Sequence, residues 1–188
     1  MTEQQGPAFI ELGYHNTPLG VLSLRKRLVA SLGEYILEVK LGDEYLMSSM
    51  FTQSERDLGR WGVELATQYS AEENSSSPSR LDVIVGGLGL GCTASEALRS
   101  PAVRSLTVVE LFRSVIDWHR DGLIATKPSV TADPRCQLLE ADFFELALSK
   151  NGFDPESPGR KYHAIIVDID HSPDLVLDEN NRLLYTTK

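Results

Sequence analysis

The stretch Leu81–Leu98, which reads LDVIVGGLGLGCTASEAL, constrains the fold more than any other part of the sequence. An apolar run leads directly into three glycines at alternate positions, Gly87, Gly89 and Gly91, and a helix-like pattern follows. Glycine tolerates a positive φ angle and lets a ligand approach the backbone closely. A helix start adds unpaired N–H groups and the positive end of a dipole. The stretch therefore predicts a strand, a tight loop and a helix that suit an anion or a nucleoside, although a plain tight connection has the same pattern.

Strand-like and helix-like segments alternate from residue 81 onward. Apolar runs typical of strands are LDVIVGG, VRSLTVVEL, RCQLLEAD and YHAIIVDID, and between them lie the helical patterns TASEALRS, RSVIDWHRDGL and FFELALSK. Continuous apolar runs are typical of strands that are buried on both faces. Repeated strand–helix–strand units predict an α/β fold, a Rossmann-like parallel sheet with right-handed crossovers.

The first 80 residues have a different pattern. Residues 1–53 contain short runs with period-2 alternation, such as EYILEVKLGDEYLMSS, and predict a small antiparallel β region. Residues 54–80 predict a connecting helix, with Ser54 as its N-cap, and a serine-rich loop. Residues 81–188 form the predicted nucleotide-binding domain. It ends after four strands, so we expect a truncated sheet; a partner or the N-terminal strands covering its edge are the alternatives.

Acidic residues follow three of the predicted parallel strands. Glu110 comes nineteen residues after Gly91, which matches the spacing of about 20 for an acid that binds ribose hydroxyls. Asp142 ends the next strand, and Asp168 and Asp170 end the fourth. Ligands of open α/β sheets bind beyond the carboxyl ends of the strands, where these acids and the glycine loop would meet. The alternatives are a solvated acid for Glu110 and helix caps or turn acids for the aspartates.

Charge and composition restrict the partners. The net charge of −9 disfavours binding to nucleic acid or to an anionic membrane. The start of the chain has no signal-peptide pattern, and no apolar run is long enough to span a bilayer, so we expect a cytoplasmic protein with reduced thiols. Cysteines and histidines lack ligand spacing, and no metal site is expected. Cys92 at a helix start is a conceivable nucleophile, but it has no identifiable base.

The G-x-G-x-G spacing, with acids after three successive strands, resembles the class I S-adenosylmethionine-dependent methyltransferase fold. Within that fold the chain is similar to the spermidine synthase family, on the segments GGLGLGCTASEAL, VVEL, DPRCQLLEAD, YHAIIVDID and NRLLYT together with the preceding β region. The resemblance implies a transferase that takes decarboxylated S-adenosylmethionine and an amine substrate. We also expect a homo-oligomer, a dimer.

The resemblance implies a role for individual residues. Gly87, Gly89 and Gly91 would hold the cofactor, Glu110 its ribose and Asp142 its adenine end. Asp168 matches the first acid of the family's D-x-x-D segment, whose acids bind the amine and help to deprotonate it. Asp170 lies at the same strand end. The second acid of that segment falls on His171, which could act as a base with a pKa near neutrality.

Two departures from the family pattern leave the reaction open. Leu90 stands where the family has an acid that holds the aminopropyl end of the cofactor, and the family's Tyr-His-Glu element is not visible. Three hypotheses follow: an aminopropyltransferase-like enzyme, a methyltransferase that uses intact S-adenosylmethionine on a small molecule, and a noncatalytic nucleoside-binding or dimerisation module. Leu90 favours the second, because it removes a repulsion from the methionine carboxylate.

Overall fold

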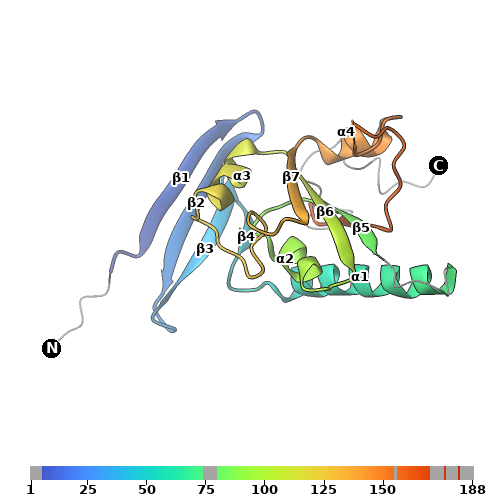
Figure 1. Cartoon of the computed structure of the whole chain (residues 1–188). Helices are drawn as coiled ribbons and strands as arrows, with labels where there is room; N and C mark the ends of the chain where they lie inside the picture. Colours follow the sequence, from blue (N-terminus) through green and yellow to red (C-terminus); the bar gives the residue numbers. More distant parts are fainter. Residues whose placement is uncertain (1–5, 74–79, 155, 170–175, 177–181, 183–188) are drawn as a thin grey trace.

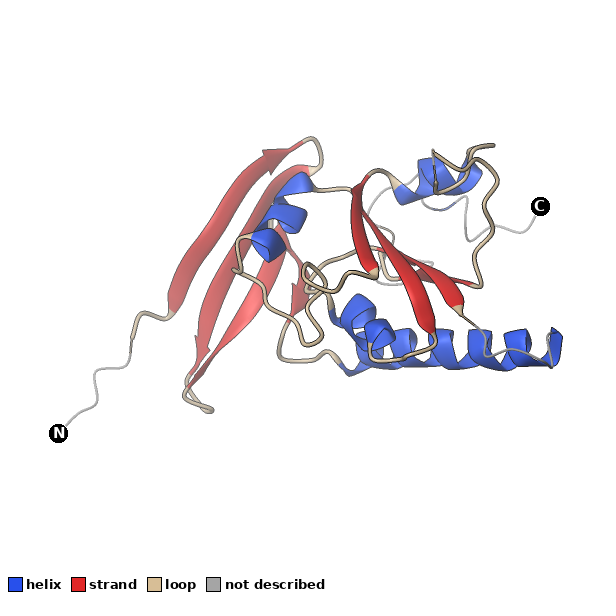
Figure 2. Cartoon of the chain, viewed as in Figure 1, coloured by secondary structure: helices blue, strands red, loops and turns tan. Residues whose placement is uncertain are grey.

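The computed structural model describes residues 6–73, 80–154, 156–169, 176 and 182. They form two β-sheets, each of four strands, with helices around the second sheet. Figure 1 shows the antiparallel N-terminal sheet on one side and the parallel sheet on the other, with the long helix α1 running beneath the latter. Figure 2 shows the same arrangement by secondary structure. The predicted α/β class, with a small antiparallel region before a parallel sheet, is confirmed.

The N-terminal sheet has the simple order β1-β2-β3-β4, and all its neighbours are antiparallel. Its strands are β1 (Phe9–Thr17), β2 (Gly20–Val29), β3 (Glu34–Leu41) and β4 (Glu44–Ser48). Alternation places apolar side chains of β2 and β3 on the face toward the core, as the period-2 pattern predicts. Glu38, on the opposite face, is nevertheless 2% exposed. Arg25 and Arg27 both pair with it, at 2.9 and 2.6 Å, which compensates the cost of burying its charge.

Helix α1 (Gln53–Glu73) connects the two sheets. It begins before Ser54 and runs past the predicted end, so Ser54 is not the N-cap; its hydroxyl donates to Glu55 instead. The helix continues to Glu73, into the start of the segment SAEENSSSPSR that was predicted as the serine-rich loop, and residues 74–79 lie outside the described part of the chain. The helix packs closely on both α2 and β8. A Cβ at Gly59 would collide with the Thr93 carbonyl, and a Cβ at Gly62 would collide with the Ile166 side chain.

The second sheet has the order β7-β6-β5-β8, and its strands are all parallel. The strands are β5 (Leu81–Gly86), β6 (Val103–Glu110), β7 (Cys136–Glu140) and β8 (Ala164–Val167). The helices between them are α2 (Cys92–Leu98), α3 (Arg113–Arg120) and α4 (Phe143–Leu148). Strand order reverses between β5 and β8, and such a switch point is where α/β sheets open a ligand crevice.

Burial separates the central strands from the edge strand β8. Every residue of β5 is buried, as its continuous apolar run predicts. In β8, by contrast, Ile165 is 53% exposed, so the prediction of burial on both faces is wrong for this strand. Among the described residues β8 pairs only with β5. The N-terminal strands form a sheet of their own, which excludes them as the cover of this edge.

Helix α3 ties the N-terminal sheet to the parallel sheet. Trp118 on α3 is buried, and its ring lies 5.8 Å from that of His15 on β1. Gly13 of β1 lies against the same indole, where a Cβ would have no room. One core cluster contains Leu22, Leu24 and Val39 of the N-terminal sheet together with residues of β5, β6 and α3. The N-terminal sheet is therefore packed as one wall beside the carboxyl ends of the parallel strands.

Asp82 stabilises the opposite end of the parallel sheet. Burial alone would raise its pKa, but hydrogen bonds from Arg104 and Ser105, with the nearby Arg160 charge, lower that pKa to about 2. A carboxyl with a lowered folded-state pKa stabilises above its unfolded pKa, and loses that contribution as pH falls through the folded value.

We expect acid titration to remove about 2 kcal/mol of the unfolding free energy between about pH 4 and pH 2 through this group alone. Urea unfolding at a series of pH values measures it, and Asp82→Asn should show a correspondingly flatter curve. Parallel curves for Asp82→Asn and the parent would contradict this assignment.

Candidate functional site

A cavity of about 640 Å³ lies between the N-terminal sheet and the carboxyl ends of the parallel strands. The N-terminal sheet contributes one wall, and the glycine loop, the ends of β6 and β8 and the start of α4 contribute the other. Its acidic lining residues are Glu110, Asp142, Glu145 and Asp168, and its described lining contains no Lys, Arg or His. The structure thus brings Gly87 and Gly89 of the predicted loop and three of the predicted acids to one cavity. Gly91, which was also predicted to hold the cofactor, is not among the residues that line it.

The glycine loop has the conformation that its sequence predicts. Gly87, Gly89 and Gly91 have φ angles of 89°, 47° and 77°, in the region that favours glycine. A Cβ on Gly87 would fall well inside van der Waals contact with the backbone carbonyl of Asp168. A Cβ on Gly91 would lie 2.9 Å from both the His119 ring and the Thr126 methyl. These glycines are required both for the turn and for the close approach of neighbouring segments.

Glu110 is a buried anchor of the glycine loop. Its Oε2 accepts a hydrogen bond from the Leu88 N–H at 2.9 Å, and its Oε1 accepts from the Phe112 N–H at 2.8 Å. Burial raises the pKa of this carboxyl, and the backbone donors oppose the rise. The alternative of a solvated acid is wrong, since Glu110 is 7% exposed. The backbone N–H groups of Gly89 and Leu111 also act on this carboxylate and oppose the rise in its pKa, so four backbone donors surround its two oxygens.

Asp142 is the N-cap of α4, as the helix-cap alternative predicts. Its Oδ1 accepts from the N–H groups of Phe144 at 2.7 Å and Glu145 at 3.1 Å, which begins α4. The same residue lines the cavity, so capping does not remove it from the candidate site. Beside it Phe143 packs against Gly86, where a Cβ would lie 2.6 Å from the ring, and fixes α4 against β5.

Asp168 ends β8 at the rim of the cavity. The Thr93 hydroxyl lies 2.5 Å from its Oδ2 and 3.0 Å from the Glu55 carbonyl oxygen. Partial burial raises the pKa of the Asp168 carboxyl, the Thr93 hydrogen bond opposes this, and the negative Glu55 adds to it. Among the described residues that line the cavity, no basic side chain stabilises the ionised form. The predicted Asp170 and His171 lie outside the described residues.

Two residues of the site were not predicted. His119 is buried, and its Nε2 lies 2.8 Å from the Gly89 carbonyl oxygen. Burial lowers the pKa of this imidazole, so the ring is neutral. Its Nε2–H donates to the Gly89 carbonyl and holds the glycine loop in place. Met47 of β4 covers the loop from the other side, since a Cβ on Gly89 would lie 2.6 Å from its sulfur. No sequence spacing indicated either contact, because each joins segments 30 or more residues apart.

Leu90 and Cys92 do not line the described cavity. Leu90 is buried in the main core cluster, so its side chain does not discriminate between the two forms of the cofactor. Burial raises the pKa of the Cys92 thiol above its usual value, and a protonated thiol is a poor nucleophile.

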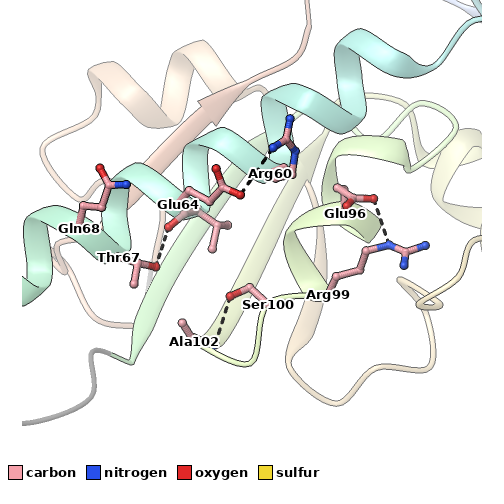
Figure 3. A pocket seen from close by; sticks show the side chains of 9 residues that line it. Arg60, Glu64, Thr67, Gln68, Glu96, Arg99, Ser100 and Ala102 are labelled. Atoms are coloured by element: carbon pink, nitrogen blue, oxygen red, sulfur yellow. Dashed lines mark hydrogen bonds and ion pairs between the residues drawn. The ribbon is translucent and has the colours of Figure 1, made fainter.

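A second depression, of about 510 Å³, lies between α1 and the end of α2. Figure 3 shows that its charged side chains already pair with one another. Arg60 lies 3.7 Å from Glu64, and Arg99 lies 3.0 Å from Glu96. It lacks a glycine loop and strand-end acids, so the candidate site is the cavity between the sheets.

Comparisons with known proteins point to one family. No family model matches the chain. The polyamine aminopropyltransferase of Sulfolobus acidocaldarius is 30% identical over 107 residues, which cover 57% of this chain and 32% of that protein. Polyamine aminopropyltransferase 2 of Pseudomonas aeruginosa is 36% identical over 61 residues, covering 32% of this chain and 18% of that protein. In these matches the chain thus spans less than a third of the length of each relative.

Two solved structures share the fold over most of this chain. Spermidine synthase from Thermotoga maritima superposes with a TM-score of 0.59 at 18% identity, over 87% of this chain and 49% of that one. A spermidine synthase in complex with the transition-state analogue AdoDATO gives a TM-score of 0.62 at 18% identity, over 90% and 50%. Fold and cavity define an α/β protein with a Rossmann-like parallel sheet and a cavity at the carboxyl edge of that sheet. In fold the chain is similar to the two spermidine synthases, and in part of its sequence it is similar to the two polyamine aminopropyltransferases.

Proposed function

We propose that the cavity binds decarboxylated S-adenosylmethionine and an amine, and that the protein transfers the aminopropyl group between them. The observation that carries the proposal is the charge of the described cavity lining, which has four acids and no basic side chain. A sulfonium nucleoside with a terminal amine and a cationic acceptor both match such a lining. The sequence relatives that are named polyamine aminopropyltransferases support the same reaction class.

The fit of the nucleoside rests on residues at three strand ends. Gly87 and Gly89 line the cavity without side chains, and Glu110, which lines it beside them, would accept hydrogen bonds from the ribose hydroxyls. Asp142 and the apolar residues beside it, Phe143 and Phe144, line the cavity at the start of α4 and would hold the adenine end. Decarboxylated S-adenosylmethionine would supply the carbon that is attacked, which its adjacent sulfonium makes electrophilic.

Asp168 is the residue that we assign to the acceptor amine. An alkylamine is protonated at neutral pH and cannot attack until it loses a proton. The carboxylate attracts the ammonium group and then accepts its proton, and its raised pKa makes it a better acceptor. The freed lone pair of the nitrogen forms the new C–N bond while the C–S bond breaks. The electron pair of the broken C–S bond stays on sulfur, and methylthioadenosine leaves. Alignment of the two substrates in one cavity would supply much of the rate.

Methyl transfer from intact S-adenosylmethionine is the second candidate. That cofactor carries a carboxylate, for which the described lining offers no cationic side chain. The buried position of Leu90 removes the sequence feature that favoured this alternative.

Calorimetry with three nucleosides tests the proposal. We expect binding of decarboxylated S-adenosylmethionine and of methylthioadenosine, and at least tenfold weaker binding of S-adenosylmethionine. Preferential binding of the intact form would favour methyl transfer. Binding of none of the three would favour the noncatalytic module.

Glu110→Ala should weaken methylthioadenosine binding about tenfold to hundredfold, because it removes charge-assisted hydrogen bonds to ribose. It should also cost about 2 kcal/mol of unfolding free energy or more, since two backbone N–H groups lose their acceptor. Affinity is measured by calorimetry at a temperature where the variant is folded, and stability by urea unfolding.

Asp82→Ala is the matched control for Glu110→Ala. It removes another buried carboxylate of the same sheet, but at the opposite end from the cavity. We expect it to lose stability while keeping the parent affinity for methylthioadenosine. Equal affinities in Glu110→Ala and the parent would refute the ribose role.

A further inference from the structure

Thr93 connects three elements of the structure through one hydroxyl group. It lies in the first turn of α2, is buried, and does not line the described cavity. Its hydroxyl oxygen is 2.5 Å from Oδ2 of Asp168 at the end of β8, and 3.0 Å from the Glu55 carbonyl oxygen of α1. The shorter distance is in the range of a hydroxyl that donates to an ionised carboxylate. One hydroxyl therefore has two acceptors within reach, on two different elements.

Close packing holds both acceptors at this hydroxyl. The backbone of α1 lies against Thr93, because a Cβ at Gly59 would collide with the Thr93 carbonyl. The Asp168 N–H donates to the Gly86 carbonyl at 2.8 Å, which fixes the backbone at the end of β8. That backbone bond leaves the Asp168 side chain free to rotate, and the hydrogen bond from Thr93 restrains this rotation.

We propose that Thr93 is a positioning residue, which holds the Asp168 carboxyl in place both before and after that carboxyl takes the proton of the amine. The inference rests on the proposed function and names the residue that orients its base. A hydroxyl can donate and accept at the same time. While Asp168 is ionised, Thr93 donates to Oδ2. When Oδ2 carries the proton, it donates to the Thr93 oxygen, and the Thr93 hydroxyl rotates so that its own proton points to the Glu55 carbonyl.

The described groups that act on Asp168 give the pH dependence its direction. Burial raises the pKa of the Asp168 carboxyl, the Thr93 hydrogen bond lowers it, and the negative Glu55 raises it. Cys92, the other titratable neighbour among the described residues, stays protonated because burial raises the pKa of its thiol. Removing the Thr93 hydroxyl leaves both neighbours in place. The pKa of Asp168 should therefore rise in a variant without this hydroxyl.

Thr93→Val and Thr93→Ser test the proposal, because valine keeps the shape and loses the hydroxyl, whereas serine keeps the hydroxyl. In Thr93→Val the acid limb of kcat/KM for aminopropyl transfer should move to higher pH. The plateau above that limb should also fall by about tenfold or more, since a hydrogen bond to a charged group no longer orients the base. Thr93→Ser should restore both features. Thr93→Ala lacks the hydroxyl without adding an apolar branch, and it carries the same expectation as Thr93→Val.

Ser95→Ala is the matched control. Ser95 is another buried residue of α2, and its hydroxyl donates to the Pro128 carbonyl at 2.8 Å. We expect Ser95→Ala to lose stability in urea unfolding while keeping the pH profile of the parent. An unchanged plateau in Thr93→Val and Thr93→Ala, a Thr93→Ser protein as impaired as these two, or the same change of profile in Ser95→Ala would overturn the inference.

Carbon-13 NMR of the Asp168 carboxyl separates this inference from the proposed function, because it needs neither substrate nor turnover. The signal is assigned by its loss in Asp168→Asn, and it is titrated in the ligand-free full chain. We expect a higher pKa in Thr93→Val than in the parent, and the parent value in Thr93→Ser. Equal titrations in all three proteins would overturn the inference even if the protein transfers aminopropyl groups. The expected titrations without any transfer would keep Thr93 as the residue that orients Asp168 and remove the proposed reaction.

Discussion

Gly87→Ala is expected to destabilise the protein by about 4 kcal/mol or more, a large fraction of the roughly 5–15 kcal/mol by which folded domains are stable. Two costs combine. The residue has a φ angle of 89°, where an L side chain is strained. Its Cβ would also meet the Asp168 carbonyl oxygen, and neither backbone segment can move freely. The Gly87 N–H donates to the Val109 carbonyl at 2.8 Å, and the Asp168 N–H donates to the Gly86 carbonyl at 2.8 Å.

Gly33→Ala separates the two costs. Gly33 also has a positive φ, 68°, but nothing lies within 4 Å of the position that its Cβ would occupy. We therefore expect only the conformational cost, about 1–2 kcal/mol. Urea unfolding of both variants measures the difference. A Gly87→Ala variant no less stable than Gly33→Ala would show that β5 and β8 are not held this closely.

Asp168→Asn is expected to lower kcat for aminopropyl transfer by about a hundredfold to ten thousandfold, the usual contribution of a general base. The same change should stabilise the folded protein at neutral pH. A carboxyl with a raised folded-state pKa contributes stability that is fully present below its unfolded pKa, and that is lost as pH rises through the folded value. An amide never ionises, so the advantage of the variant should grow with pH above about 4.

The opposing effects on activity and stability distinguish a catalytic carboxylate from a structural carboxylate. Asp154→Asn supplies the comparison, because a hydrogen bond from Arg160 lowers the pKa of Asp154 and holds this carboxyl in its charged form. We expect that variant to keep full activity and to gain no stability as pH rises. Thermal unfolding between about pH 3 and pH 8 and initial rates near neutral pH provide both readouts. An Asp168→Asn protein that turns over at the parent rate would remove Asp168 from the mechanism.

Much of the candidate site could be predicted from local pattern. Gly87, Gly89, Glu110, Asp142 and Asp168 line one cavity, as their positions after successive strands predicted. This works because parallel strands joined by helices bring all their carboxyl ends to one edge. The binding and catalytic roles of these residues stay predictions.

Other features could not be predicted, because they depend on contacts between distant segments. The exposure of Ile165 followed from the place of β8 at the edge of the described sheet, and an apolar run does not report which strands lie beside it. The neutral His119 beneath the glycine loop and Met47 above it belong to α3 and β4, which reach the loop only when the two sheets pack.

The sequence by itself determined the order of elements, the glycine turn and the acids at the strand ends, because periodicity and backbone freedom act over a few neighbouring residues. Only the tertiary structure decided that Glu110 is buried against backbone donors. It also decided that Glu38 pairs with two arginines on the face of its sheet that does not line the cavity. Tertiary packing likewise decided that Leu41, Leu46 and Met47 of the N-terminal sheet line the same cavity as the acids. Burial and pairing of charge depend on which surfaces meet, and folding settles that through the packing of whole sheets.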